Sequence, residues 1–232
     1  MNVLNIAHRG ASRDAPENTL EAFRLAVEQG ADMIETDLHR TRDGRIPLWH
    51  DGDVAGLEIA SHTLSELRGK LPELVTLEEL LDALGGRVPL NLELKRAESG
   101  DYAGLVPQVL DEVRRRGLLE QTLFSSFYDP VLAELRSLEP AARIGLLISR
   151  KAPVGMLERS ERLRAEAVHP ELAIATPELI EAIQASGRRV YVFTVDDPET
   201  QRRLCAKGVD GMFTNVPAQL RDLLAGSEPV TA

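Results

Sequence analysis

Eight short apolar runs recur along the chain, and amphipathic segments separate them. Runs that are apolar throughout, rather than alternating with polar residues, are typical of parallel β-strands buried on both faces. The expected strands are Val3–His8, Met33–His39, Val88–Lys95, Thr122–Ser126, Ile144–Ser149, Ala165–His169, Val190–Val195 and Gly211–Thr214. Strands that alternate with helices predict an α/β protein with a parallel sheet.

Signals that start and stop helices fall between these runs. A capping residue followed three positions later by glutamate predicts a helix N-terminus, because each side chain satisfies a backbone N–H of the first turn. Such capping boxes are expected at Asn18, Thr63 and Thr76. N-cap residues followed by proline are Asp129, Thr176 and Asp197, and glycines expected to end helices are Gly30, Gly117, Gly187 and Gly208.

A parallel sheet of this size closes into a (β/α)₈ barrel or stays open and doubly wound. The count of eight strands favours the barrel, and a 232-residue chain has the length of a barrel in one domain. An open sheet that binds dinucleotides would need a glycine-rich loop after the first strand, which His8-Arg9-Gly10-Ala11-Ser12 is not. We predict a TIM barrel as a single domain over residues 1–232, with a short insertion after strand 2.

Composition excludes several classes of partner. A net charge of −10 argues against nonspecific nucleic-acid binding, which needs a basic face. No run of about 18 apolar residues occurs, so no membrane span is expected. The start, Met1-Asn2-Val3, enters a strand-like run without the pattern of a secretory leader, which predicts a cytoplasmic protein. Cys205 is the single cysteine, so no internal disulfide forms, and we expect a buried structural thiol.

Seven polar residues that suit chemical roles lie near the ends of the expected strands. In a barrel, the carboxyl ends of all strands open at one end, where the working groups of such proteins lie. These residues are His8, Arg9, Glu35, Asp37, His50, Glu93 and Lys95.

Three of them suit a metal ion. Glu35 and Asp37 are two positions apart, so both side chains leave one face of their strand, and Glu93 repeats this arrangement with Lys95 on the next strand. Three converging carboxylates repel one another unless a cation lies between them, and oxygen ligands suit Mg²⁺ or Ca²⁺ rather than zinc. We therefore predict a divalent metal site, and the alternative is that salt bridges to Arg9 and Lys95 occupy the carboxylates.

A hairpin is expected to bring His50 to the same place. Asp43-Gly44 is a strong signal for a two-residue turn between antiparallel segments. With these two residues as the loop, His50 pairs with Asp37 and its side chain lies on the same face.

The two histidines and two cations then suit phosphodiester cleavage. An imidazole that titrates near neutrality can remove a proton from a nucleophile or give one to a leaving alkoxide, and His8 and His50 can divide these tasks. Arg9 and Lys95 would hold the non-bridging phosphate oxygens.

The remaining histidines have weaker claims. His39 and His169 are candidates for the rim or mouth of the barrel, and His62 is expected at the surface. Asn18 is expected mainly to cap a helix, where it could also steady a substrate.

The motifs of the chain resemble those of the glycerophosphodiester phosphodiesterase family over nearly its whole length. The most specific ones lie in the first fifty residues. They are Ala7-His8-Arg9-Gly10-Ala11-Ser12, Ala15-Pro16-Glu17-Asn18-Thr19, Ile34-Glu35-Thr36-Asp37-Leu38, Thr41-x-Asp43-Gly44 and His50-Asp51, followed later by Asn91-Leu92-Glu93-Leu94-Lys95, Val190-Tyr191-Val192-Phe193-Thr194-Val195 and Thr214-Asn215-x-Pro217.

The resemblance implies a TIM barrel that hydrolyses small glycerophosphodiesters to an alcohol and glycerol 3-phosphate, with a glycerol hydroxyl as internal nucleophile. It implies that Glu35, Asp37 and Glu93 hold the metal and that His8 and His50 are the acid–base pair. Arg9 and Lys95 would contact the phosphate.

The chain departs from the family pattern in three places. The segment between His50-Asp51 and Thr76 is short, so a more open pocket is expected. Phe193 stands where the family often has tryptophan, and Asn215 where it often has aspartate. These departures leave the head-group preference open.

Two alternatives stay open. One is a related phosphodiesterase that cleaves lysophospholipids, which an exposed apolar patch beside the pocket would favour. The other is a barrel that binds a phosphate ligand without catalysis, because a fold by itself does not determine function. A metal-dependent amidohydrolase would need a His-x-His pair near the first strand, which is absent.

Overall fold

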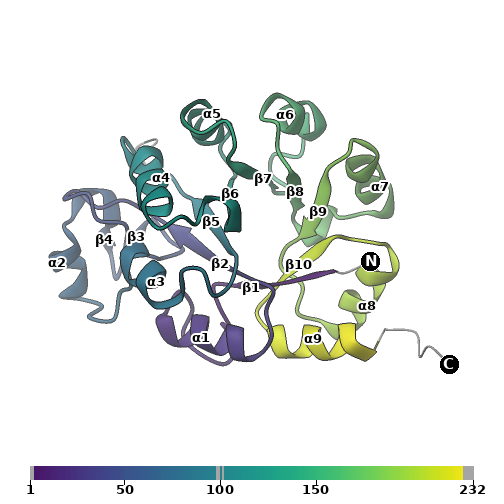
Figure 1. Ribbon diagram of the computed structural model, residues 1–232, viewed down its shortest axis with the longest axis horizontal. Helices are drawn as coiled ribbons and strands as arrows, with labels where there is room; N and C mark the ends of the chain where they lie inside the picture. The colour runs from purple at the N-terminus through teal and green to yellow at the C-terminus, as the bar shows by residue number, and fades with distance from the viewer. Residues whose placement is uncertain (1–2, 98–99, 101, 227–232) are drawn as a thin grey trace.

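The computed structural model describes residues 3–97, 100 and 102–226 of the chain. Eight parallel strands form a closed barrel (Figure 1). In barrel order they are β1 (Leu4–His8), β2 (Met33–Leu38), β5 (Leu90–Leu94), β6 (Thr122–Ser126), β7 (Arg143–Ile148), β8 (Ala167–Pro170), β9 (Arg189–Val192) and β10 (Gly211–Thr214). All eight expected strands and the predicted barrel are therefore confirmed. Residues 1–2, 98–99, 101 and 227–232 of the predicted domain lie outside the described residues.

Helices surround the barrel, as Figure 1 shows. They are α1 (Leu20–Glu28), α2 (Leu64–Arg68), α3 (Leu77–Leu84), α4 (Leu105–Arg115), α5 (Asp129–Leu138), α6 (Met156–Arg162), α7 (Pro177–Ala185), α8 (Pro198–Ala206) and α9 (Pro217–Gly226). Short 3₁₀ turns are η1 (Ile59–Ser61), η2 (Leu119–Gln121) and η3 (Leu172–Ile174), and a two-stranded ribbon, β3 (Asp53–Val54) with β4 (Leu57–Glu58), lies between β2 and β5. No helix among the described residues is long and apolar enough to cross a membrane.

Apolar side chains fill two separate layers. One layer, inside the barrel, is formed by Ile6, Met33, Leu123, Ala167, Tyr191 and Phe213. The larger layer lies between strands and helices and includes Ile34, Leu92 and Ile144, whose side chains leave the opposite faces of the strands. Because the interior is packed at the amino ends of the strands, polar groups are accommodated at their carboxyl ends.

Most of the expected helix caps are confirmed, and two are wrong. Thr63 and Thr76 form complete capping boxes, and Thr176 and Asp197 cap α7 and α8. The cap of α1 is Thr19, whose hydroxyl accepts a hydrogen bond from Ala22 at 3.2 Å, and not Asn18. Asp129 is the first residue of α5 rather than its cap, because its carboxylate pairs with Arg159 at 2.7 Å.

The hairpin after β2 is present, but its predicted register is wrong by one residue. Leu38 pairs with Leu48, and the Trp49 N–H donates to the Asp37 carbonyl at 3.1 Å. Trp49 therefore lies opposite Asp37, where His50 was expected. The loop has three residues rather than two, and it ends at Gly44, whose φ of 77° suits the left-handed position of such a loop.

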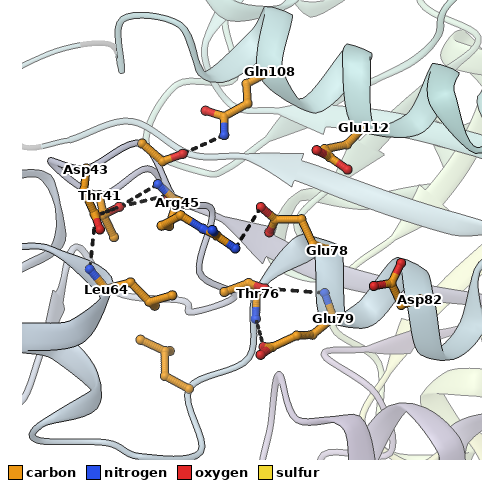
Figure 2. A network of polar contacts seen from close by, with 12 residues as sticks. Thr41, Asp43, Arg45, Leu64, Thr76, Glu78, Glu79, Asp82, Gln108 and Glu112 are labelled. Atoms are coloured by element: carbon orange, nitrogen blue, oxygen red, sulfur yellow. Dashed lines mark hydrogen bonds and ion pairs between the residues drawn. The ribbon is translucent and has the colours of Figure 1, made fainter.

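Contacts within the hairpin and from two neighbouring helices hold its tip in place (Figure 2). The Asp43 carboxylate accepts hydrogen bonds from the Thr41 hydroxyl at 2.6 Å and from the Leu64 N–H of α2 at 3.1 Å. The Gln108 amide of α4 donates to the Gly44 carbonyl at 2.6 Å. The hairpin is thus fixed against the helices that follow it, which limits where the chain beyond it can run.

Candidate active site

A cavity of about 200 Å³ opens at the carboxyl ends of the strands. Six of the seven residues expected at the site line it, and the seventh, Asp37, is buried beside them at 1% exposure. The other lining residues are Asn91, Ser125, Phe127, Leu147, Phe193, Thr194 and Phe213. The expected convergence of these residues is therefore present.

Three carboxylates from two adjacent strands form the centre of the site. Asp37 and Glu93 are paired in the register of β2 and β5, and Glu35 precedes Asp37 on the same face. One oxygen of each carboxylate lies within 4.8 Å of one oxygen of the others, and all three residues are buried. Burial, and then the charges of Asp37 and Glu93, raise the pKa of Glu35 well above its ordinary value. The cluster therefore holds more negative charge than its surroundings neutralise, which fits a divalent cation with oxygen ligands.

Lys95 and Arg9 supply the positive charge near these carboxylates. The Lys95 Nζ lies 3.1 Å from Asp37 Oδ1 and 2.9 Å from Glu93 Oε1. The Arg9 Nε lies 3.2 Å from Asp37 Oδ2, in ionic contact without hydrogen-bond alignment. Although burial opposes it, Lys95 and Arg9 lower the pKa of Asp37 to about 2. The salt bridges that were the alternative to a metal site thus exist within the same cluster. They neutralise only part of the negative charge of the three carboxylates.

An unusual turn after β1 places Arg9 over the cluster. Arg9 has a φ of 57° and Gly10 a φ of 85°. The Arg9 N–H donates to Glu35 Oε2 at 3.0 Å, so this residue contacts the carboxylates with both its backbone and its side chain. A Cβ on Gly10 would lie 2.7 Å from the backbone of Ala22, so the turn requires glycine.

His8 is held in one tautomer by Asn215, just after β10, and by Asp196, in the loop before α8. Its Nδ1 lies 2.8 Å from Asn215 Oδ1. The Asn215 amide nitrogen donates to the Asp196 carboxylate at 2.6 Å, which fixes the amide with its oxygen toward His8. Nδ1 of His8 must therefore carry the proton, and Nε2 keeps its lone pair. Burial, and then the charge of Arg9, lower the pKa of His8, so the ring is neutral near pH 7.

His50 reaches the same cavity from the chain just beyond the hairpin. Its Nδ1 donates to Asp51 Oδ1 at 2.7 Å, so Nε2 is again the nitrogen left for chemistry. The His39 Nε2 donates to the His50 carbonyl at 3.3 Å, and the Tyr102 hydroxyl donates to His39 Nδ1 at 2.7 Å. His50 is thus positioned through its backbone, and not by pairing with Asp37.

The other histidines take no place in the cavity lining. His39 lies beneath the segment that carries His50, with its pKa lowered to about 4 by burial, so its expected place on the rim is wrong. His62 lies outside the cavity lining, and its Nδ1 is 2.8 Å from the carbonyl oxygen of Glu58, just before η1. His169 is fully buried inside the barrel, with its ring 5.2 Å from that of Tyr191 and 5.1 Å from that of Phe213.

His169 is expected to make folding stability depend on pH. Burial lowers its pKa from 6.5 to about 3, so the folded ring stays neutral while the unfolded chain takes up a proton below pH 6.5. The free energy of unfolding therefore falls as the pH falls through this window. Between about pH 7 and about pH 5.5 the residue is expected to cost about 1 kcal/mol of stability.

Urea unfolding at both pH values measures this loss in the wild type and in His169→Met, which is close in volume and does not titrate. The variant is expected to lose about 1 kcal/mol less than the wild type over the interval. An equal loss in both proteins would show that His169 is not the cause.

Among the residues that shape the site, Asn18 was expected in the wrong main role, and neither Asp196 nor Tyr102 was identified from the sequence. Asn18 has a φ of 57°, and its amide donates to Asp37 Oδ2 at 3.0 Å while its oxygen accepts from the Thr36 hydroxyl at 2.7 Å. Asn18 therefore orients a carboxylate of the cluster and does not cap a helix. Asp196 and Tyr102 act through other residues from distant parts of the chain, so no local spacing marks them.

Comparisons of the sequence with known proteins identify the family of the chain. The sequence model of the glycerophosphoryl diester phosphodiesterase family matches residues 8–219. A glycerophosphodiester phosphodiesterase of Caldanaerobacter subterraneus subsp. tengcongensis is 32% identical over 246 residues, which cover 97% of this chain and 98% of that protein.

Solved structures show the same fold. A phosphodiesterase of Oleispira antarctica, in complex with the product sn-glycerol-3-phosphate, has a TM-score of 0.84 at 26% identity, with 97% of each chain covered. A glycerophosphodiester phosphodiesterase of Thermotoga maritima has a TM-score of 0.82 at 26% identity, with 96% of this chain and 99% of that chain covered.

These matches define an enzyme of the phosphodiesterase class built on a (β/α)₈ barrel. The chain belongs to the glycerophosphoryl diester phosphodiesterase family. The reading of the barrel as a non-catalytic binding protein is therefore excluded.

Proposed function

We propose that the whole chain, residues 1–232, acts as one unit that hydrolyses small glycerophosphodiesters to an alcohol and glycerol 3-phosphate with the help of a divalent metal ion. One observation carries the proposal: three buried carboxylates, two cations and two imidazoles surround a single cavity at the mouth of the barrel. The product bound in the Oleispira antarctica structure is the one that this reaction would release.

Glu35, Asp37 and Glu93 would hold the metal ion. Mg²⁺ and Ca²⁺ both accept carboxylate oxygens, so the donor set admits either. When bound, such an ion withdraws electron density from a phosphate oxygen and offsets negative charge that develops during cleavage. The Asn18 amide would keep Asp37 in its ligating orientation, because it holds one carboxylate oxygen at 3.0 Å.

Arg9 and Lys95 would bind the non-bridging oxygens of the substrate phosphate. Both side chains line the cavity and lie within 3.2 Å of the metal-site carboxylates, so a phosphate near the ion is within their reach. A guanidinium offers paired donors to a phosphate, whereas an ammonium acts as a point charge. Together they would orient the phosphate and stabilise the charge that grows on it in the transition state.

His8 and His50 would divide the proton transfers. The neutral His8, with its lone pair on Nε2, suits the base that accepts the proton of the attacking hydroxyl. His50 suits the acid that gives a proton from Nε2 to the departing alkoxide, because its Nδ1 is engaged by Asp51 and its side chain lines the cavity. The proton lost by the attacking glycerol hydroxyl and the proton gained by the departing alkoxide thus balance, and this step leaves a cyclic phosphate. A water molecule would then open the cyclic phosphate to glycerol 3-phosphate, with the two histidines in the reverse roles.

Release of glycerol 3-phosphate from several glycerophosphodiesters tests the proposal. A chelator is expected to abolish release, and added Mg²⁺ or Ca²⁺ is expected to restore it. His8→Ala is expected to lower kcat by about 10²–10⁴-fold, because it removes the base. His62→Ala, a substitution outside the cavity, serves as the matched control and should keep full activity. Activity that survives both the chelator and His8→Ala would refute this mechanism.

A further inference from the structure

A second cavity of about 500 Å³ adjoins the catalytic one at the same end of the barrel. Phe127 and Leu147 line both cavities, so they form the shared edge between them. Most of its lining comes from the ends of β6 and β7 and the loops that follow them, and β6 is the barrel neighbour of β5, which carries Glu93. A phosphodiester has two ester arms, and a substrate whose phosphate lies beside Lys95 can extend one arm over this edge.

The walls of the second cavity are basic, although the chain carries a net charge of −10. Arg150, Lys151 and Arg159 line it together with one carboxylate, Glu171. Glu171 is fully engaged, because it pairs with the Arg150 guanidinium at 2.9 Å and accepts the Arg150 N–H at 2.9 Å. Arg159 is neutralised by Asp129.

Lys151 is the charge that remains. Its side chain is exposed, and it forms no ion pair with any residue in the described part of the chain. Arg150 uses only part of its five donors on Glu171, so it too can bind an anion. Lys151 and Arg150 thus offer positive charge to the arm of a substrate that enters this cavity.

The same walls are unsuited to a cationic arm. A quaternary ammonium group is bound by open aromatic faces or unpaired carboxylates. The ring of Tyr128 in this cavity is covered by the guanidinium of Arg96, which lies 4.8 Å from the ring centroid. The Glu171 carboxylate is held by Arg150, as described above. Apart from Phe127 at the shared edge, the cavity therefore presents cations where a choline group would need anions or aromatic faces.

We propose that this second cavity binds the alcohol arm of the substrate and selects alcohols that carry an anionic group, such as a second phosphate. The inference rests on the proposed function, because it assigns a binding site to one arm of the glycerophosphodiester. Lys151 and Arg150 contact the anionic group, and Phe127 with Leu147 supports the chain of atoms that leads to it.

Three substrates that differ in the charge of the alcohol test this assignment: glycerophosphoinositol 4-phosphate, glycerophosphoglycerol and glycerophosphocholine. The wild type is expected to show the highest kcat/KM with the first and the lowest with the last. The preference should weaken between about 50 mM and about 300 mM salt, because salt screens exposed charges.

Lys151→Glu is expected to lower kcat/KM for the anionic substrate by about fivefold, mainly through KM, and to leave glycerophosphoglycerol within about twofold. Lys207→Glu makes the same charge change after α8, at the opposite end of the barrel, and should alter none of the three values. Equal kcat/KM for all three substrates in the wild type would overturn the inference alone, as would an equal loss on all three in Lys151→Glu. If none of the three substrates released glycerol 3-phosphate, the proposed function would be overturned as well.

Discussion

His50→Ala is expected to lower kcat by about 10²–10⁴-fold while KM and metal affinity change little. The side chain is half-exposed at the edge of the cavity and holds up no packed core, so its loss should not unfold the protein. What it removes is the proton that the leaving alkoxide needs. The effect should therefore appear in the chemical step and not in substrate binding.

Steady-state kinetics with glycerophosphoglycerol measure kcat and KM, and a metal titration measures the metal affinity of the variant. A substrate with a much more acidic alcohol, which departs without protonation, should recover most of the lost rate in His50→Ala. A variant that instead lost metal affinity at unchanged kcat would show that His50 supports the ion and not the leaving group.

Glu35→Ala is expected to weaken metal binding by at least about 100-fold, since even partners of metal ligands contribute about 10–100-fold. Glu35 is one of three carboxylates whose oxygens lie within 4.8 Å of one another, so its removal leaves two. Calorimetric titration with Mg²⁺ and Ca²⁺ measures the change directly. Activity should return in part at high metal concentration, because the acid–base groups are intact.

Two further variants complete the Glu35 experiment. Glu35→Gln keeps an oxygen that can accept the Arg9 N–H, so it separates the loss of the ligand charge from a disturbance of the turn after β1. Glu120→Gln changes an exposed carboxylate of η2, at the amino ends of the strands, and should leave metal affinity unaltered. Unchanged affinity in both Glu35 variants, with a large fall in kcat, would reverse the roles assigned to Glu35 and His50.

The fold was predictable because its signals are local and repeated. Each buried strand is a short apolar run. Four helices are capped by side chains that accept a hydrogen bond from the backbone N–H three residues later, at Thr63, Thr76, Thr176 and Asp197. The errors arose where a tertiary contact competed with the local signal. Asn18 has the sequence of a cap, but its amide is used by Asp37, and the neighbouring Thr19 takes the cap instead.

The site was predictable where one strand carries two of its residues. Glu35 with Asp37, and Glu93 with Lys95, share a face because the strand repeats every two residues. The position of His50 was not predictable. The sequence Asp43-Gly44 occurs in both two-residue and three-residue loops, and the pairing register of the hairpin differs by one residue between them. The partners of the histidines, Asn215 and Tyr102, come from distant segments that only the closed barrel brings near.

Every group proposed to take part in bond breaking comes from the first 95 residues, on or just after β1, β2, β5 and the hairpin. The second cavity is instead lined by residues after 126. If the second cavity binds the alcohol arm as proposed, substitutions in the loops after β6 and β7 would change which alcohols the enzyme prefers without replacing any of these groups. Paralogues that evolve a new substrate specificity are therefore expected to differ mainly in the second half of the chain and to keep the residues of the first half.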